Sequence, residues 1–201
     1  MRTGWLWALV LGSITVVCCS CQSNEGSSAP SSDGSTQTAV APDGAVYTKY
    51  NIHFISEKGK NKASYANWTE WTGHDMLPYN SKIEASSFLN RIRVVEVGTG
   101  REIEMEFHAG RMGMGAKEYI DLITSPTPVS YPDLSDVDRQ GVKEGKALVG
   151  MSKQGVMIAL GYPAKHETPS TDQNRWTYWK GRMANYAVEF DNNGKVTSVQ
   201  K

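Results

Sequence analysis

Residues 150–163 read GMSKQGVMIALGYP, and this stretch predicts a helix with a defined start and a defined end. Ser152 precedes the apolar run, and a serine hydroxyl at that position accepts a hydrogen bond from a free backbone N–H of the first helical turn. Gly161 and Pro163 follow the run, as a C-cap glycine and a helix breaker do. The apolar positions on one side of this helix are Val156, Ala159 and Leu160.

A second helical pattern lies immediately upstream. Apolar or small residues recur there at spacings of three and four, which places them along one side of a helix. These positions are Leu134, Val137, Gly141, Gly145 and Leu148. The two glycines allow the backbone of another element to approach closely, at a cost of about 1 kcal/mol each in helix propensity.

Three strands are predicted downstream, over residues 175–180, 185–190 and 195–199. The last two are joined by Asp191-Asn192-Asn193-Gly194, residues that tolerate positive φ and therefore favour a hairpin. The order helix, helix, strand, strand, strand predicts an antiparallel sheet with one helical layer on its apolar face. The expected fold class is therefore α+β, with a two-layer ααβββ domain over residues 133–201.

At these positions the sequence resembles the SmpA/OmlA family of outer-membrane lipoproteins, also called BamE-like. The resemblance covers about residues 133–199 and rests on Gly150-Met151-Ser152-Lys153-Gln154, Leu160-Gly161-Tyr162-Pro163, Arg175-Trp176-Thr177-Tyr178 and the run from Val188 to Val196. It implies an accessory subunit of the machine that folds β-barrels into the outer membrane, and hence an envelope or outer-membrane protein complex as partner.

The matching residues also have structural tasks, as helix cap, helix end, sheet core or hairpin turn. They are Gly150, Met151, Ser152, Gly161, Pro163, Trp176, Tyr178, Phe190 and Gly194. β-Lactamase-inhibitor-like proteins share this combination of helices and sheet, and fold alone does not fix a function. The chain also carries about 80 additional residues, 44–124, ahead of the matching part.

This additional segment predicts a small β-domain followed by a short helix. Short runs rich in β-branched and aromatic residues alternate with turn signals. The runs cover residues 46–54, 63–68, 82–85, 92–97 and 102–107, and the helix covers residues 116–124. Ile103, Met105 and Phe107 alternate with glutamates, which indicates a strand with one buried face. Five short strands in about 65 residues predict a small barrel of the SH3-like kind.

Residues 125–132 contain three prolines in eight residues. This composition favours extended chain and prevents a helix from running through. We therefore expect a linker there, between a domain at residues 44–124 and a domain at residues 133–201.

The amino-terminal residues indicate where the protein resides. Arg2 precedes an uncharged apolar run over residues 5–17. That run is too short for an ordinary membrane span and has the layout of a cleavable secretion signal. We therefore expect a signal peptide over residues 1–20.

A cysteine after such a run resembles the lipobox of bacterial lipoproteins, in which the thiol is lipidated. Cys21 follows the small residue Ser20 and is the expected lipidation site, with Cys19 as the alternative. Residues 21–43 are then the lipidated cysteine and a flexible tether, because this segment has too few apolar residues to fold. Gln22 at the second mature position is not the aspartate that this lipoprotein class associates with retention in the inner membrane, so the resemblance favours the outer membrane. We expect the protein to face the periplasm.

Composition and motifs favour a non-catalytic protein. The chain has 21 basic and 21 acidic residues and no basic block, so nothing predicts nucleic acid as a partner. No cysteine follows position 21, which removes the thiol nucleophile and the disulfide from the folded part. The four histidines, His53, His74, His108 and His166, lack the spacing of metal ligands. We predict no enzyme activity, no metal and no cofactor.

Aromatic residues supply the candidate ligand or partner surface. Tyr65, Trp68 and Trp71 lie close together in the predicted β-domain. Clustered aromatics there either fill the core or form an exposed platform for an extended peptide or a sugar.

Two functions therefore stay open. One is an assembly-type lipoprotein that docks on an envelope complex by an exposed edge of its carboxy-terminal domain. The other is a binding or inhibitory module whose β-domain captures a peptide, a glycan or an envelope enzyme.

Overall fold

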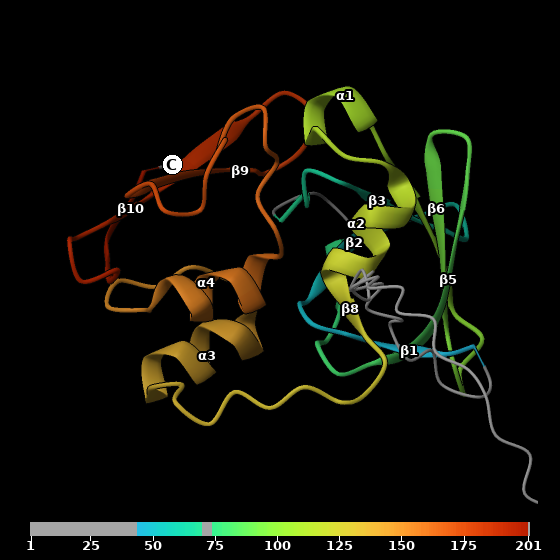
Figure 1. The fold of residues 1–201 in the computed structure, drawn as a ribbon, viewed down its shortest axis with the longest axis horizontal. Coiled ribbons are helices and arrows are strands. Elements are labelled where there is room, and N and C mark those ends of the chain that lie inside the picture. Colours follow the sequence, from blue (N-terminus) through green and yellow to red (C-terminus); the bar gives the residue numbers. More distant parts are fainter. Residues whose placement is uncertain (1–43, 70–73, 201) are drawn as a thin grey trace, which may run out of the picture. The chain divides into compact units, whose positions relative to one another are not determined.

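The computed structural model describes residues 44–69 and 74–200, which all belong to one compact unit formed by residues 37–201. The fold is α+β, as predicted (Figure 1). The strands of the larger sheet are β1 (Val46–Thr48), β2 (Ile52–Glu57), β3 (Lys60–Ser64), β4 (His74–Leu77), β5 (Lys82–Phe88), β6 (Arg91–Glu96), β7 (Glu102–Glu106) and β8 (Thr124–Ser125). The remaining elements are α1 (Ala109–Met112), α2 (Ala116–Ile123), α3 (Asp136–Glu144), α4 (Lys153–Leu160), β9 (Arg175–Trp179), β10 (Asn185–Phe190) and β11 (Val196–Gln200).

The larger sheet is a curled, open, mixed sheet, and the five-stranded SH3-like barrel is not confirmed. Its strand order is β4-β2-β3-β7-β6-β5-β1-β8, with β3 and β7 parallel and the other pairs antiparallel. The run predicted as one strand over residues 46–54 is divided at Asn51. Its first half pairs with β5 and β8, and its second half pairs with β3 and β4. The two halves therefore lie in different parts of the strand order, with β3, β7, β6 and β5 between them.

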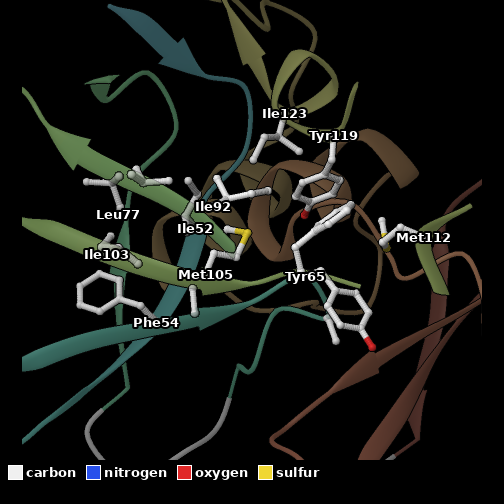
Figure 2. Close-up of a cluster of buried hydrophobic side chains, with 14 of the residues drawn as sticks. Ile52, Phe54, Tyr65, Leu77, Ile92, Ile103, Met105, Met112, Tyr119 and Ile123 are labelled. Carbon is white, nitrogen blue, oxygen red and sulfur yellow. The ribbon is translucent and has the colours of Figure 1, made fainter. Parts of the chain in front are cut away.

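Helices α1 and α2 both supply buried residues to the core on the inner side of this sheet. Helix α2 packs on β5, β6 and β8, and it buries Tyr119 and Ile123 in the core (Figure 2). The alternation predicted for β7 is confirmed, because Ile103 and Met105 are buried while the glutamates between them are exposed. Figure 2 shows Tyr119 and Ile123 close to the strand residues Ile92 and Met105.

The carboxy-terminal strands form a separate antiparallel sheet in the order β11-β10-β9. Tyr186 pairs with Tyr178, and Val188 pairs with Trp176, so these buried side chains share one face. They belong to the same core cluster as Val156, Ala159 and Leu160 of α4. Residues from the helices and from the sheet thus exclude water from one common core.

Helix α3 is shorter than the spacing of apolar residues predicts. It ends at Gly145, whose φ of 64° is left-handed, so Leu148 lies beyond the helix. The predicted close approach occurs at Gly141, where a Cβ atom would lie 2.2 Å from Sδ of Met151. Glycine is therefore required at position 141 by the packing of the segment before α4.

Asp138 connects the amino-terminal ends of α3 and α4. Its carboxylate is buried and accepts hydrogen bonds from the backbone N–H and hydroxyl of Ser135, the N-cap of α3. It also accepts from the backbone N–H of Ser152 at 2.6 Å and from its hydroxyl at 3.0 Å. Burial raises the pKa of Asp138, but these hydrogen bonds outweigh it and lower the pKa below its ordinary value.

The proline-rich segment 125–132 contributes a strand and tertiary hydrogen bonds. Ser125 belongs to β8 and pairs with Tyr47 of β1. Asn80 exchanges two hydrogen bonds with the backbone of Val129, both 2.7 Å long. The Tyr131 hydroxyl donates to the Lys49 carbonyl at 3.1 Å. The segment therefore runs along the larger sheet rather than simply spanning the gap to the next helix.

The carboxy-terminal end of α4 depends on Asn51, which is buried between β1 and β2. The last four carbonyls of a helix have no partner within it. In α4, the Ile158 carbonyl accepts from the Asn51 backbone N–H at 2.9 Å, and the Ala159 carbonyl accepts from the Asn51 amide at 3.2 Å. The same amide donates to the Val142 carbonyl of α3 at 2.9 Å, and its oxygen accepts from the backbone N–H of Tyr79. One side chain therefore joins the larger sheet to both helices.

We expect Asn51→Ala to lower the free energy of unfolding by about 3 kcal/mol, because it leaves buried backbone groups without partners. Urea unfolding followed by circular dichroism measures this loss. Asn193→Ala is the control, since Asn193 is exposed in the β10–β11 turn and should change stability by less than about 0.5 kcal/mol. Equal stability of the two variants would contradict the proposed role of Asn51.

Candidate functional site

A depression of about 890 Å³ lies over the outward face of β3, β7 and β6. Its lining combines cations, carboxylates and one aromatic ring. The lining residues are Gly59, Lys60, Asn61, Lys62, Ala63, Trp68, Asn90, Arg91, Glu102, Glu104, Glu106 and Arg182. Because charges of both signs face the same space, this surface is suited to bind a polar partner through ion pairs and hydrogen bonds.

Strand pairing arranges these charges in rows of alternating sign. Parallel pairing places Lys62 of β3 beside Glu104 of β7, and antiparallel pairing places Arg93 of β6 beside Glu104. Arg91 forms an ion pair with Glu104, and Arg93 binds Glu102 through two hydrogen bonds of 2.8 Å. The hydrogen bonds from Arg93 lower the pKa of Glu102. Much of the charge on this face is thus neutralised by neighbouring strands.

Two cations of the depression are not neutralised in this way. In the part of the chain that the structure describes, neither Lys60 nor Arg182 forms an ion pair. Lys60 lies at the start of β3, whereas Arg182 comes from the connection between β9 and β10. The Arg182 guanidinium carbon lies 5.4 Å from the centre of the Trp68 ring, within the range of a cation–π contact. The depression therefore takes residues from both halves of the chain.

The described aromatic residues of the predicted platform do not form an exposed surface. Trp68 is only 7% exposed and forms an isolated parallel bridge with Trp179. Tyr65 is buried, and its hydroxyl accepts a hydrogen bond from Arg111 at 3.0 Å. Trp71 lies outside the described residues, as does the expected lipidation site Cys21. Of the two interpretations for these aromatics, core packing describes Tyr65, whereas Trp68 is largely buried but also lines the depression.

The family-motif residues occupy structural positions. Met151, Pro163, Trp176, Tyr178 and Phe190 are buried. Ser152 caps α4 by accepting a hydrogen bond from the backbone N–H of Gly155, and Gly161 follows α4 with a φ of 82°. The Tyr178 hydroxyl donates to the Gly161 carbonyl at 3.1 Å. Gly150 and Gly194 both have positive φ. These contacts hold the helices on the smaller sheet and leave few of the motif side chains for a ligand.

Sequence spacing does not predict the histidine pair formed by His53 of β2 and His74 of β4. The His53 Nε2 lies 2.7 Å from the Ala159 carbonyl and donates to it, because a carbonyl only accepts. The His53 Nδ1 is then the acceptor for the Nε2–H of His74 at 2.8 Å. The two rings are stacked, with their centres 5.1 Å apart. Only the pairing of β2 with β4 brings these residues together, and β4 lacks a clear strand signal.

The buried position of His53 disfavours its charged form. Burial is the main cause that lowers its pKa to about 4, and the charge of His74 lowers it further. The hydrogen bond to Ala159 acts in the opposite direction and raises the pKa. His53 is therefore neutral at neutral pH and holds one tautomer.

Among residues 44–69 and 74–200, no three His, Cys, Asp or Glu side chains are grouped so as to hold a metal ion. Within the same ranges, every helix is too short or too polar to cross a membrane. Comparison with family models, with curated proteins and with solved structures finds no match to this chain.

We expect the protein to lose stability as the pH falls from about 6.5 to about 4. In this range the unfolded chain binds a proton at His53 that the native chain does not bind, so acid favours unfolding. The full difference between the two pKa values corresponds to about 3 kcal/mol. Urea unfolding at a series of pH values measures this slope.

His53→Gln tests the assignment of that slope. The glutamine amide retains a donor for the Ala159 carbonyl but does not titrate, so the decrease in stability between about pH 6.5 and about pH 4 should become smaller. Asp138 contributes equally to both proteins, because its lowered pKa makes stability fall as the pH approaches the ordinary value of 3.8 in wild type and variant alike. An unchanged slope in His53→Gln would assign the pH dependence to other groups.

Proposed function

We propose that the protein is a non-catalytic, membrane-anchored bacterial lipoprotein that acts by protein–protein contact in the cell envelope, as an accessory subunit of outer-membrane assembly. The depression over β3, β7 and β6 is the observation that favours this proposal. Its lining offers ion pairs, hydrogen bonds and one aromatic ring over an open surface, which suits a protein segment. Among the described lining residues, two cations without an ion pair, Lys60 and Arg182, outnumber the one such carboxylate, Glu106, so we expect the partner to present carboxylates there.

The carboxy-terminal part of the chain supports a second proposal, which concerns its fold. Two helices precede three antiparallel strands, and all five elements supply residues to one core. This is the order of elements expected for the two-layer ααβββ domain of the SmpA/OmlA family. The motif residues at the helix cap, the helix end and the sheet core carry the resemblance. We propose membership of that fold for residues 133–201.

The proposed anchor is the lipidated cysteine at position 21. Cys21→Ser should move the protein from the membrane fraction to the soluble fraction of the periplasm, because the remaining residues include no cysteine after position 21. Fractionation and immunoblotting measure the distribution, and metabolic labelling with a fatty acid reports the modification directly. Cys19→Ser is the matched control and should stay in the membrane. Loss of labelling in Cys19→Ser, with labelling retained in Cys21→Ser, would move the anchor to Cys19.

The partner surface is tested by charge reversal at the two unpaired cations. Lys60→Glu combined with Arg182→Glu should decrease the cross-linking yield of the envelope partner about tenfold or more in native membranes. The reason is that each substitution replaces a cation by a carboxylate, which would repel the carboxylates expected on the partner. Because neither cation forms an ion pair in the described part of the chain, the fold should stay intact. Lys143→Glu on the exposed surface of α3 is the control and should keep the wild-type yield.

The identity of the cross-linked partner separates the two functions. Capture of envelope-assembly components supports the accessory role. Capture of a single envelope enzyme, with inhibition of its activity, would replace the accessory role by the inhibitory one. Capture that is unchanged in the double variant would show that the depression is not the contact surface.

A further inference from the structure

Three side chains with metal-binding atoms share one face of the larger sheet, where β2 pairs with β4. Met76 lies directly opposite His53 in the antiparallel register, and His74 precedes Met76 by two residues, so all three point to the same side. The two histidines supply imidazole nitrogens, and the methionine supplies a thioether sulfur. On this side the strands meet the end of α3, at Gly145, and the end of α4, at Ala159.

The two histidine rings already direct one nitrogen each at the other ring. Nδ1 of His53 and Nε2 of His74 are 2.8 Å apart, whereas the ring centres are 5.1 Å apart and the ring planes differ by 25°. The difference between the two separations, 2.3 Å, is about twice the distance from the centre of an imidazole to one of its nitrogens. Both nitrogens therefore lie on the line between the ring centres, and a cation that replaces the shared proton is in reach of both.

The orientation of His53 is fixed by its other nitrogen. Nε2 donates to the Ala159 carbonyl at 2.7 Å, so the proton of the neutral ring is on Nε2 and Nδ1 keeps its lone pair. Histidines that bind a metal commonly donate their second N–H to a backbone carbonyl in this way. Burial lowers the pKa of His53 to about 4, so protons do not compete for Nδ1 at neutral pH. His53 thus has the tautomer and the orientation of a preformed ligand.

The sulfur of Met76 lies beside the same ring. Sδ of Met76 is 2.7 Å, and Cε1 of His53 is 2.9 Å, from the point that a Cβ atom at Gly145 would occupy, so the two atoms are no more than 5.6 Å apart. Cε1 is the ring carbon bonded to both nitrogens. A methionine side chain has three rotatable bonds, which let its sulfur adjust over this distance. Met76 is therefore in position to act as a third ligand.

This set of ligands selects for a soft cation. Imidazole together with a thioether, without a thiolate or a carboxylate, suits Cu(I). Asp75 lies between His74 and Met76 in sequence but on the opposite face, 3.7 Å from Arg101. In the part of the chain that the structure describes, no third His, Cys, Asp or Glu joins the histidine pair. Zn²⁺ prefers four ligands, and these residues do not supply them.

We propose that His53, His74 and Met76 form a binding site for Cu(I) between the larger sheet and the ends of α3 and α4. The cation replaces the proton that joins the two rings, and that proton moves from Nε2 to Nδ1 of His74 by exchange with solvent, so both rings stay neutral. With metal–nitrogen bonds of about 2.0 Å at a trigonal angle, the two nitrogens lie about 3.5 Å apart, so the half-exposed His74 withdraws by about 0.7 Å. Sequence spacing does not predict this site, because strand pairing brings its ligands together. The proposal does not depend on the lipid anchor or on the depression.

The experiment titrates Ag(I) into the full-length chain in detergent. Ag(I) is a soft cation like Cu(I) and is stable in air. All three cysteines are replaced by serine, so that no thiol competes for the metal. We expect one Ag(I) per chain and shifts of the ¹⁵N signals of only two of the four histidines, His53 and His74. At about a hundredfold excess of free Ag(I) over Kd, the thermal midpoint should rise by about 5–10 °C. Competition with a chromophoric Cu(I) chelator without oxygen then measures the affinity for Cu(I) itself.

Single substitutions test each ligand. His53→Gln and His74→Gln should lower the affinity for Ag(I) by about 100-fold or more, beyond the about 10–100-fold loss typical of groups that only support a ligand. Met76→Leu retains the volume of the side chain and removes the sulfur, so it should lower the affinity by about tenfold while the metal-free protein keeps its thermal midpoint. His166→Gln is the matched control, since His166 packs on Trp179 instead, and it should keep the wild-type affinity.

Several results would overturn the proposal. Binding of Ag(I) that His74→Gln leaves unchanged would place the metal elsewhere on the chain. An affinity that Met76→Leu leaves unchanged, or an equal affinity of the wild-type protein for Zn²⁺, would contradict the selection of a soft cation. A thermal midpoint that excess Ag(I) does not raise would show that the histidine pair is a structural hydrogen bond only. None of these results bears on the proposed function, whose tests measure fractionation and cross-linking.

Discussion

Helix α4 is held at both ends by buried polar groups from other parts of the chain, and the rest of the fold depends on this arrangement. An isolated helix of eight residues is unstable in water, so tertiary contacts have to supply what propensity does not. At the amino-terminal end, Asp138 of α3 accepts hydrogen bonds from Ser152. At the carboxy-terminal end, Asn51 and His53 donate to the Ala159 carbonyl. Each group is costly to bury alone, and the cost disappears only when the partner element is in place.

These contacts also connect the two sheets and thereby form the depression on the surface. Asn51 and His53 belong to the larger sheet, and α4 carries the core of the smaller one, so the two sheets are connected through the end of the helix. The bridge between Trp68 and Trp179 is a second connection. Arg182 extends from the smaller sheet over the ring of Trp68 for this reason. The depression is consequently a product of tertiary contact, and neither segment forms it alone.

Sequence patterns predict the local features of this fold and miss those that depend on distant partners. The cap at Ser152, the hairpin after Phe190 and the alternation in β7 follow from neighbours within a few residues, and the structure confirms each of them. The division of residues 46–54 at Asn51 does not follow from such neighbours. It depends on hydrogen bonds from Asn51 to the carbonyls of Val142 and Ala159, which are about 90 to 110 residues away in the sequence. The histidine pair has the same origin, since β4 has no apolar run and is ordered by its pairing with β2. An α+β class with a helical carboxy-terminal part is predictable, whereas the open sheet and the depression are not.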